Sequence, residues 1–157
     1  MGRADDKEKV KELLFDGFTE SSVSGKGGVS IVSIVGQGGI GKTNHAKMVF
    51  NEIKEQFGNR SWWVCASEKP NRMGLLQKIL KEVCKESQGE PLKDSTSFPG
   101  GEVEGILLGC AKGSKILITS RKVEVSHGIG AKMHTLLEMS SNESWSLFLH
   151  VAFKQEC

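Results

Sequence analysis

Residues 29–43 read VSIVSIVGQGGIGKT, and this stretch decides the fold. Residues 29–35 form a short apolar, β-branched run bounded by glycines, which is typical of a buried strand in a parallel sheet. Residues 36–43 match the pattern G-x-x-x-x-G-K-[ST], which joins a strand to a helix. Apolar residues at helical spacing follow and predict that helix: Ala46, Val49, Phe50, Ile53 and Phe57.

The residue types in this loop suit a polyphosphate. Glycines let backbone N–H groups point inward at phosphate oxygens, and the N-terminus of the next helix adds the positive end of its dipole. Lys42 would bridge the β- and γ-phosphates, and the Thr43 hydroxyl would complete the coordination of Mg²⁺. The alternative is a glycine-rich turn with an incidental Lys-Thr pair. We expect a nucleotide-binding site made of Gly36, Gly38, Gly39, Ile40, Gly41, Lys42, Thr43 and Asn44.

Strands and helices alternate along the chain, which predicts an α/β domain with a parallel sheet and flanking helices. Residues 5–18 place apolar side chains at helical spacing, with Asp5 and Asp6 available as N-terminal caps. The segment 61–66 (SWWVCA) is predicted to be a strand and 115–119 (KILIT) a buried strand. A further amphipathic helix is expected after Pro70, and a loop at 87–101.

The C-terminal region predicts one more helix. Ser140 and Glu143 fit a capping box at its start. Trp145 and Phe148 fall on its apolar face with Leu149 and Ala152, so we expect them to pack in the core and not to form a platform for stacking a base.

The composition predicts a single globular domain. The chain has 157 residues, 38% hydrophobic and 25% charged, far from the composition of disordered chains. Its formal net charge of +2 indicates no direct binding of nucleic acid. No apolar run approaches the roughly 20 residues that cross a bilayer. The four cysteines are widely spaced without a CxxC pair, so we expect a cytoplasmic protein with neither disulfides nor a zinc site.

Five ordered segments together resemble the NB-ARC nucleotide-binding domain of plant disease-resistance proteins. The segments are Gly2-Arg3 before a charged helix, GQGGIGKT (36–43), FGNRSWWVCASE (57–68), KGSKILITSR (112–121) and the stretch 133–153. The resemblance implies an incomplete P-loop NTPase fold of the STAND type. It also implies an N-terminal helix and linker at 1–28 and a partial NB-ARC domain at 29–157.

The resemblance also implies functional roles. Arg121 would be the sensor that contacts the terminal phosphate, and Arg3 would border the adenine pocket. The protein would be a switch in plant innate immunity, with ADP holding an off state and ATP an on state. Its protein partners would be an immune receptor or the N-terminal signalling domains of one.

The chain departs from the family pattern in two places. Asn44 and His45 stand where the family usually has Thr and Leu, and we expect His45 to be exposed or hydrogen-bonded and not a catalytic base. The Walker B strand, which ends in Asp-Asp, should lie between Lys85 and Gly113, but no acidic residue there follows an apolar run. We therefore assign no catalytic residue and expect little or no ATP hydrolysis.

Without the Walker B strand, residues 61–66 lose their expected neighbour in the sheet. They could pair with 115–119, residues 103–108 could fill the gap, or that edge could expose Trp62 and Trp63. Two other functions stay open: a non-hydrolysing fragment that associates with a full-length receptor, and a P-loop ATPase or kinase.

Overall fold

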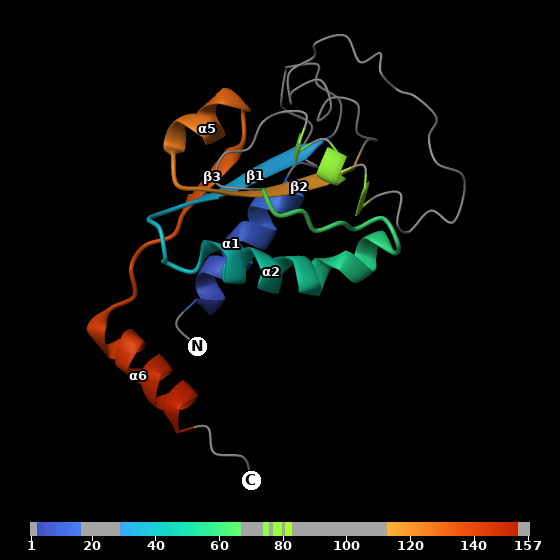
Figure 1. Ribbon diagram of the computed structural model, residues 1–157. Helices are drawn as coiled ribbons and strands as arrows, with labels where there is room; N and C mark the ends of the chain where they lie inside the picture. Colours follow the sequence, from blue (N-terminus) through green and yellow to red (C-terminus); the bar gives the residue numbers. More distant parts are fainter. Residues whose placement is uncertain are drawn as a thin grey trace, which may run out of the picture. The chain divides into compact units, whose positions relative to one another are not determined.

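The strand β1 (Ser30–Val35) is the middle strand of a three-stranded parallel sheet in the computed structural model of the chain (Figure 1). The strand order is β2–β1–β3, with β2 at Lys115–Ser120 and β3 at Lys132–Thr135. The structure describes residues 3–16, 29–66, 74–75, 77–79, 81–82 and 113–153. The predicted α/β fold with a parallel sheet is confirmed, as are the strands expected at 29–35 and 115–119. The burial expected of 115–119 is wrong, because β2 lies at an edge of the sheet and its residues are half-buried or exposed.

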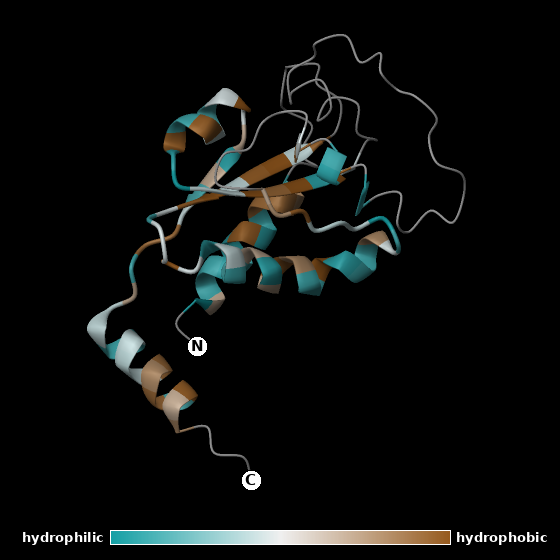
Figure 2. Ribbon diagram, in the orientation of Figure 1, coloured by the Kyte–Doolittle hydropathy of each residue, from teal (hydrophilic) through white to brown (hydrophobic). Residues whose placement is uncertain are grey.

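Helices cover both faces of this sheet. Figure 1 shows α1 (Ala4–Phe15) and α2 (Lys42–Ile53) on one side and α5 (Val123–Gly128) on the other. A strand that is covered on both faces carries apolar residues throughout, and Figure 2 shows β1 as mainly apolar. The buried apolar side chains of the described residues are Val10, Leu14, Val32, Ile34, Val35, Ala46, Val49, Ile53 and Leu136.

The N-terminal helix forms as predicted, but its first turn is capped differently. Arg3 occupies the N-cap position and makes no side-chain capping bond, so the prediction that Asp5 or Asp6 caps the helix is wrong. Both aspartates lie inside the first turn, where a carboxylate is favoured by the helix dipole. The Asp6 carboxylate instead contacts Nε2 of His134 on β3, at 3.1 Å. That contact ties α1 to an edge strand of the sheet.

Residues 51–110 form a unit separate from the one built by residues 1–50 and 111–157. In it, the 3₁₀ helix η2 (Lys54–Phe57) ends at Gly58, whose φ of 58° is one that glycine adopts readily. The described residues between 74 and 82 are helical, as expected after Pro70. The predictions for 17–28, 87–101 and 103–110 lie outside the described residues.

The predicted strand at 61–66 is wrong, because these residues have no regular secondary structure. An extended segment becomes a strand only when a neighbour accepts its backbone hydrogen bonds, and the sequence lacks the Walker B strand that should lie beside it. Trp62 is 40% exposed and Trp63 is half-buried, so the exposure expected of the two tryptophans holds for Trp62 alone.

Two elements were not predicted from the sequence. The strand β3 has only four residues, KMHT, of which three are exposed, so it carries no apolar run. The helix α5 is a short VEVSHG segment with one buried residue, Ser126. Both are held by contacts with β1, which local periodicity does not reveal.

The last helix, α6 (Ser141–Ala152), begins with the predicted capping box. The Ser140 Oγ accepts from the Glu143 N–H, and the Glu143 carboxylate accepts from the Ser140 N–H at 2.9 Å. The Ser140 Oγ–H also donates to the Glu143 carboxylate at 2.8 Å, and the two bonds that Ser140 donates lower the pKa of that carboxyl. The helix therefore starts where the sequence predicts.

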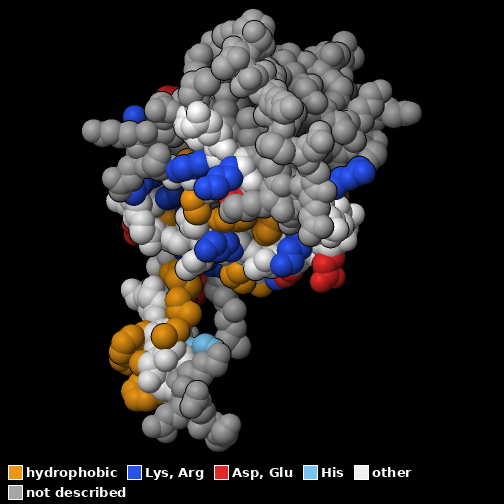
Figure 3. Space-filling view, turned by 45° about the vertical axis from the view of Figure 1, so that its right-hand side comes forward, with side chains coloured by type: hydrophobic (Ala, Val, Ile, Leu, Met, Phe, Trp, Pro, Cys, Tyr) orange, Lys and Arg blue, Asp and Glu red, His pale blue; other side chains and the backbone are white. Residues whose placement is uncertain are grey.

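The predicted burial of the apolar face of α6 is wrong for the described structure. Trp145 is 61% exposed and Phe148 54% exposed, and no residue of α6 is buried. Hydrophobic side chains gather along this helix in the space-filling view (Figure 3). Periodicity identifies which face of a helix is apolar, but it does not identify what covers that face.

A buried hydroxyl pair joins β1 to α5. The Ser126 Oγ donates to the Ser33 Oγ at 2.7 Å, and both side chains are fully buried. We expect Ser33→Ala to lower the free energy of unfolding by about 1–3 kcal/mol, because it leaves a buried hydroxyl without its acceptor. The double variant Ser33→Ala/Ser126→Ala should lose less than the sum of the two single losses. Urea unfolding of all four proteins tests this, and additive losses would contradict it.

His45 of α2 is a buried imidazole, contrary to the expectation that it is exposed or hydrogen-bonded. It is 2% exposed, and neither ring nitrogen has a hydrogen-bond partner in the described structure. Burial lowers the pKa of His45 below its usual 6.5, and the nearby Asp6 offsets part of that effect. The site therefore suits the leucine that the family resemblance puts there.

Acid should therefore destabilise the fold through His45. Below about pH 6.5 the unfolded chain binds a proton that the folded His45 resists, so stability is lost as the pH falls. We expect His45→Leu to unfold at a midpoint that changes less between pH 7.5 and 5.5, measured by urea titration at each pH. The exposed His127 gives the control, His127→Gln, which should keep the wild-type dependence.

Candidate functional site

The loop 36–41 lies where the strands of the parallel sheet end. It leaves the carboxyl end of β1 and enters α2 at Lys42. The ends of the two neighbouring strands meet it there: Arg121 follows β2, and Leu136 follows β3. In open α/β sheets, ligands bind at this edge. The fold thus brings together residues that are about 80–100 positions apart in the sequence.

The backbone of this loop requires glycine at several positions. Gly39 and Gly41 have φ values of 79° and 94°, which other residues rarely adopt. Gly36 is restricted for another reason, because a Cβ atom there would lie 2.9 Å from the carbonyl oxygen of Leu136. A loop of this shape directs backbone N–H groups towards a bound anion.

The Lys42 side chain turns back over the loop. Its Nζ donates to the carbonyl oxygens of Gly36 at 2.8 Å and Gln37 at 2.6 Å. Burial lowers the pKa of Lys42, and the positive charge of Arg121 lowers it further. An ammonium group held over a glycine loop is placed to contact phosphate oxygens of a ligand in that loop.

Thr43 and Asn44 follow Lys42 in the first turn of α2, and both are exposed. The first backbone N–H groups of a helix have no partner within the helix and so can bind an anion. Helical bonding begins with the His45 N–H, which donates to the Gly41 carbonyl at 2.9 Å. Thr43 thus has an exposed hydroxyl beside the loop, as a metal-ligand role would need.

Arg121 reaches the same loop from β2. A Cβ atom added to Gly38 would lie 3.5 Å from both Cζ and Nε of Arg121, so the guanidinium lies beside the loop. Together with Lys42 it makes two cationic groups at one glycine-rich turn. The fold therefore brings Arg121 beside the phosphate loop, near the place that the family resemblance implies for it.

Arg3 also lies at the loop, through different contacts. Its Nη2 donates to the carbonyl oxygen of Ile40 at 3.2 Å and to that of Leu137 at 3.1 Å. The family resemblance named Arg3, beside the adenine, and it gave no role at the loop to Leu136 or Leu137. The only available signal was the likeness of 133–153 to a family segment, which gave no role for their backbone.

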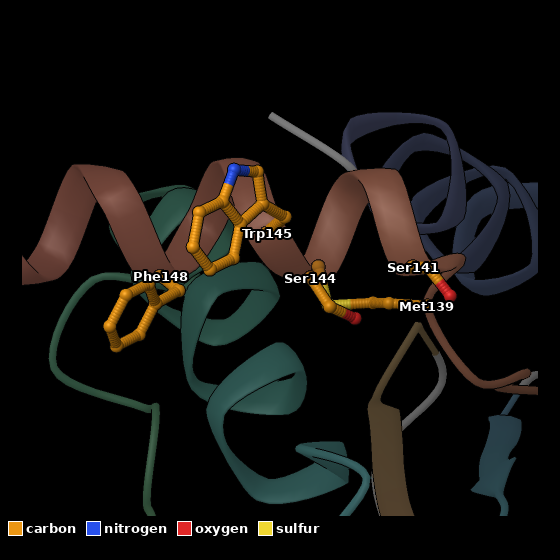
Figure 4. Close-up of a pocket in the computed structure, with 5 residues that line it drawn as sticks. All are labelled: Met139, Ser141, Ser144, Trp145 and Phe148. Carbon is orange, nitrogen blue, oxygen red and sulfur yellow. The ribbon is translucent and has the colours of Figure 1, made fainter.

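A second surface feature lies on α6. A shallow hollow is lined by Met139, Ser141, Ser144, Trp145 and Phe148, and no residue of the phosphate loop belongs to it (Figure 4). The rings of Trp145 and Phe148 stack with their centres 5.4 Å apart. This hollow is apolar and open, so it lacks the charged groups that a nucleotide needs.

Two other kinds of site are absent from the described residues. No group of three or more His, Cys, Asp or Glu side chains there could hold a metal ion. None of the described helices is long and apolar enough to cross a membrane.

Comparisons with known proteins find similarity to plant disease-resistance proteins. Disease resistance protein RPP13 of Arabidopsis thaliana is 28% identical over 187 residues, covering 98% of this chain and 21% of RPP13. Disease resistance protein RGA2 of Solanum bulbocastanum is 26% identical over 184 residues, covering 97% of this chain and 18% of RGA2. Probable disease resistance protein RF45 of Arabidopsis thaliana is 39% identical over 92 residues, covering 57% of this chain and 9% of RF45.

The chain thus spans about a fifth of RPP13 and less of the other two. The alignment with RPP13 has 187 positions and the chain 157 residues, so RPP13 has at least 30 residues in this region without a counterpart here. The NB-ARC domain family matches residues 3–106, which are 104 of the 157 residues and include the whole phosphate loop. The chain belongs to the NB-ARC domain family, a family of P-loop nucleotide-binding domains.

Proposed function

We propose that the chain binds ADP or ATP together with Mg²⁺ at the loop 36–41 and the first turn of α2. The observation that carries this proposal is the pair of cations at one glycine-rich loop. The Lys42 ammonium lies over the loop, and the Arg121 guanidinium lies beside Gly38. Two cations and the N-terminus of a helix match the charge of a polyphosphate. The exposed Thr43 hydroxyl would be a ligand of the magnesium ion.

The biological role that we propose is a nucleotide-dependent switch in a plant disease-resistance protein. The names of the relatives support a role in disease resistance. A γ-phosphate adds negative charge next to Lys42 and Arg121, and it can therefore favour one arrangement of the chain over another. We place the protein in the cytoplasm and expect protein partners from the same immune system.

Slow or absent ATP hydrolysis is part of the proposal. The sequence offers no Asp-Asp strand to hold the magnesium shell and polarise water. The extra residues of RPP13 in the aligned region support a deletion in this chain relative to that protein. The rival function of an ATPase or kinase predicts the opposite kinetics.

A role in association is the second candidate, because α6 exposes large apolar side chains. Leu147, Phe148, Val151 and Phe153 are each about half exposed or more, as is Trp145. Large apolar patches on a protein surface mark interaction sites. Such a role would not require nucleotide, so nucleotide binding separates the two candidates.

Lys42→Ala should weaken binding of MgADP and MgATP by about tenfold to hundredfold, because a hydrogen bond to a charged group contributes about 1.5–3 kcal/mol. Fluorescent nucleotide analogues give the dissociation constants. The matched control is Lys47→Ala, which removes an exposed lysine from the same helix. Wild-type protein that binds neither nucleotide would favour the association function. Phosphate release that depends on Lys42 would favour the enzyme.

Arg121→Ala should weaken binding of MgATP more than binding of MgADP. The γ-phosphate adds negative charge that a sensor cation attracts. Removal of the Arg121 guanidinium should therefore change the ratio of the two dissociation constants. Isothermal titration with both nucleotides measures that ratio. The adjacent Lys122→Ala is the control and should leave it unchanged, whereas equal losses in Arg121→Ala would argue against a sensor role.

A further inference from the structure

Arg3 makes two contacts that join distant parts of the chain at the phosphate loop. One guanidinium nitrogen, Nη2, donates to Ile40 and to Leu137, which are 37 and 134 positions away in the sequence. A terminal guanidinium nitrogen carries two N–H donors, so these two bonds occupy it. Arg3 therefore links the N-terminus of α1, the end of the loop and the segment that follows β3.

The bond from Arg3 to the Ile40 carbonyl constrains the end of the loop, where the chain enters α2. Ile40 is the residue before Gly41, whose φ of 94° sets the direction of the chain into α2. At the other end of the loop, Gly36 lies against the Leu136 carbonyl, and the Leu136 N–H donates to Val35 at 2.7 Å. Residues 136–137 thus hold the start of the loop directly and its end through Arg3.

The element that carries Arg3 is itself firmly placed. Val10 and Leu14 of α1 are fully buried, and Asp6 contacts His134 on β3. A rigid guanidinium fork at the start of such a helix can fix the position of a loop. Arg3 is thus suited to hold backbone in place as well as to contact a ligand.

We propose that Arg3 is a positioning residue that holds Ile40 and Gly41 in the conformation that binds phosphate. The inference rests on the proposed nucleotide binding and adds a residue that acts on the phosphates through the loop. The family resemblance instead sets Arg3 beside the adenine. The two roles differ in whether the effect of Arg3 needs a base on the ligand.

A ligand that lacks a nucleobase distinguishes the positioning role of Arg3 from a contact with adenine. Arg3→Ala should weaken binding of MgATP and of magnesium tripolyphosphate by the same factor, about tenfold if the loop keeps its binding conformation one tenth of the time. Arg3→Lys, which keeps the charge without the planar fork, should show a smaller loss. The control is Lys9→Ala, which removes an exposed cation from α1 and should bind both ligands as wild type does. Weaker MgATP binding with unchanged tripolyphosphate binding would overturn the proposal.

Hydrogen exchange on the ligand-free protein gives a second readout. The His45 amide, which bonds to the Gly41 carbonyl, should exchange faster in Arg3→Ala than in wild type or Lys9→Ala, while the amides of β1 stay protected. Unchanged exchange at His45 would overturn the positioning role of Arg3 even if nucleotide affinity falls. If wild-type protein binds neither ligand, the proposed function fails, and the exchange result alone then decides on Arg3. If Arg3→Ala does not fold, the same comparisons are made with Arg3→Lys.

Discussion

The close approach of Leu136 to Gly36 is the constraint on which the rest of the site depends. The backbone leaving β3 bonds to Val35 and leaves no space for a side chain at position 36. The loop must therefore turn away immediately after β1, and its later glycines supply the positive φ values that this path requires. Lys42 and Arg121 gain their positions relative to the loop from the same arrangement of three parallel strands.

Local patterns predicted the elements whose residues carry their own signal. The strand β1, the loop and α2 follow one another in the sequence, so their chemistry was visible in residues 29–53. The Ser140–Glu143 capping box was equally local. By contrast, β3 has exposed residues in a four-residue strand, and it exists because β1 offers an unpaired edge. No sequence window contains that information.

The errors at 61–66 and at α6 have a common physical cause. Both segments have the composition of buried structure, and both depend on a partner that the pattern does not name. SWWVCA needed a neighbouring strand, and the aromatic residues of α6 needed an opposing surface. The error at His45 is the opposite one, because a polar side chain that was expected to be exposed or hydrogen-bonded is buried. Tertiary contacts decided each case.

The contacts of α1 also determine when the site can form during synthesis. Asp6 needs His134, Arg3 needs Leu137, and Lys132 donates to the Leu13 carbonyl. A helix near the start of this sequence is thus bonded to β3 and to the residues that follow it, which are made much later. Contacts of such long sequence separation form late and slowly. A nascent chain that already contains the whole phosphate loop therefore cannot hold it in its final shape until more than ninety further residues have been made.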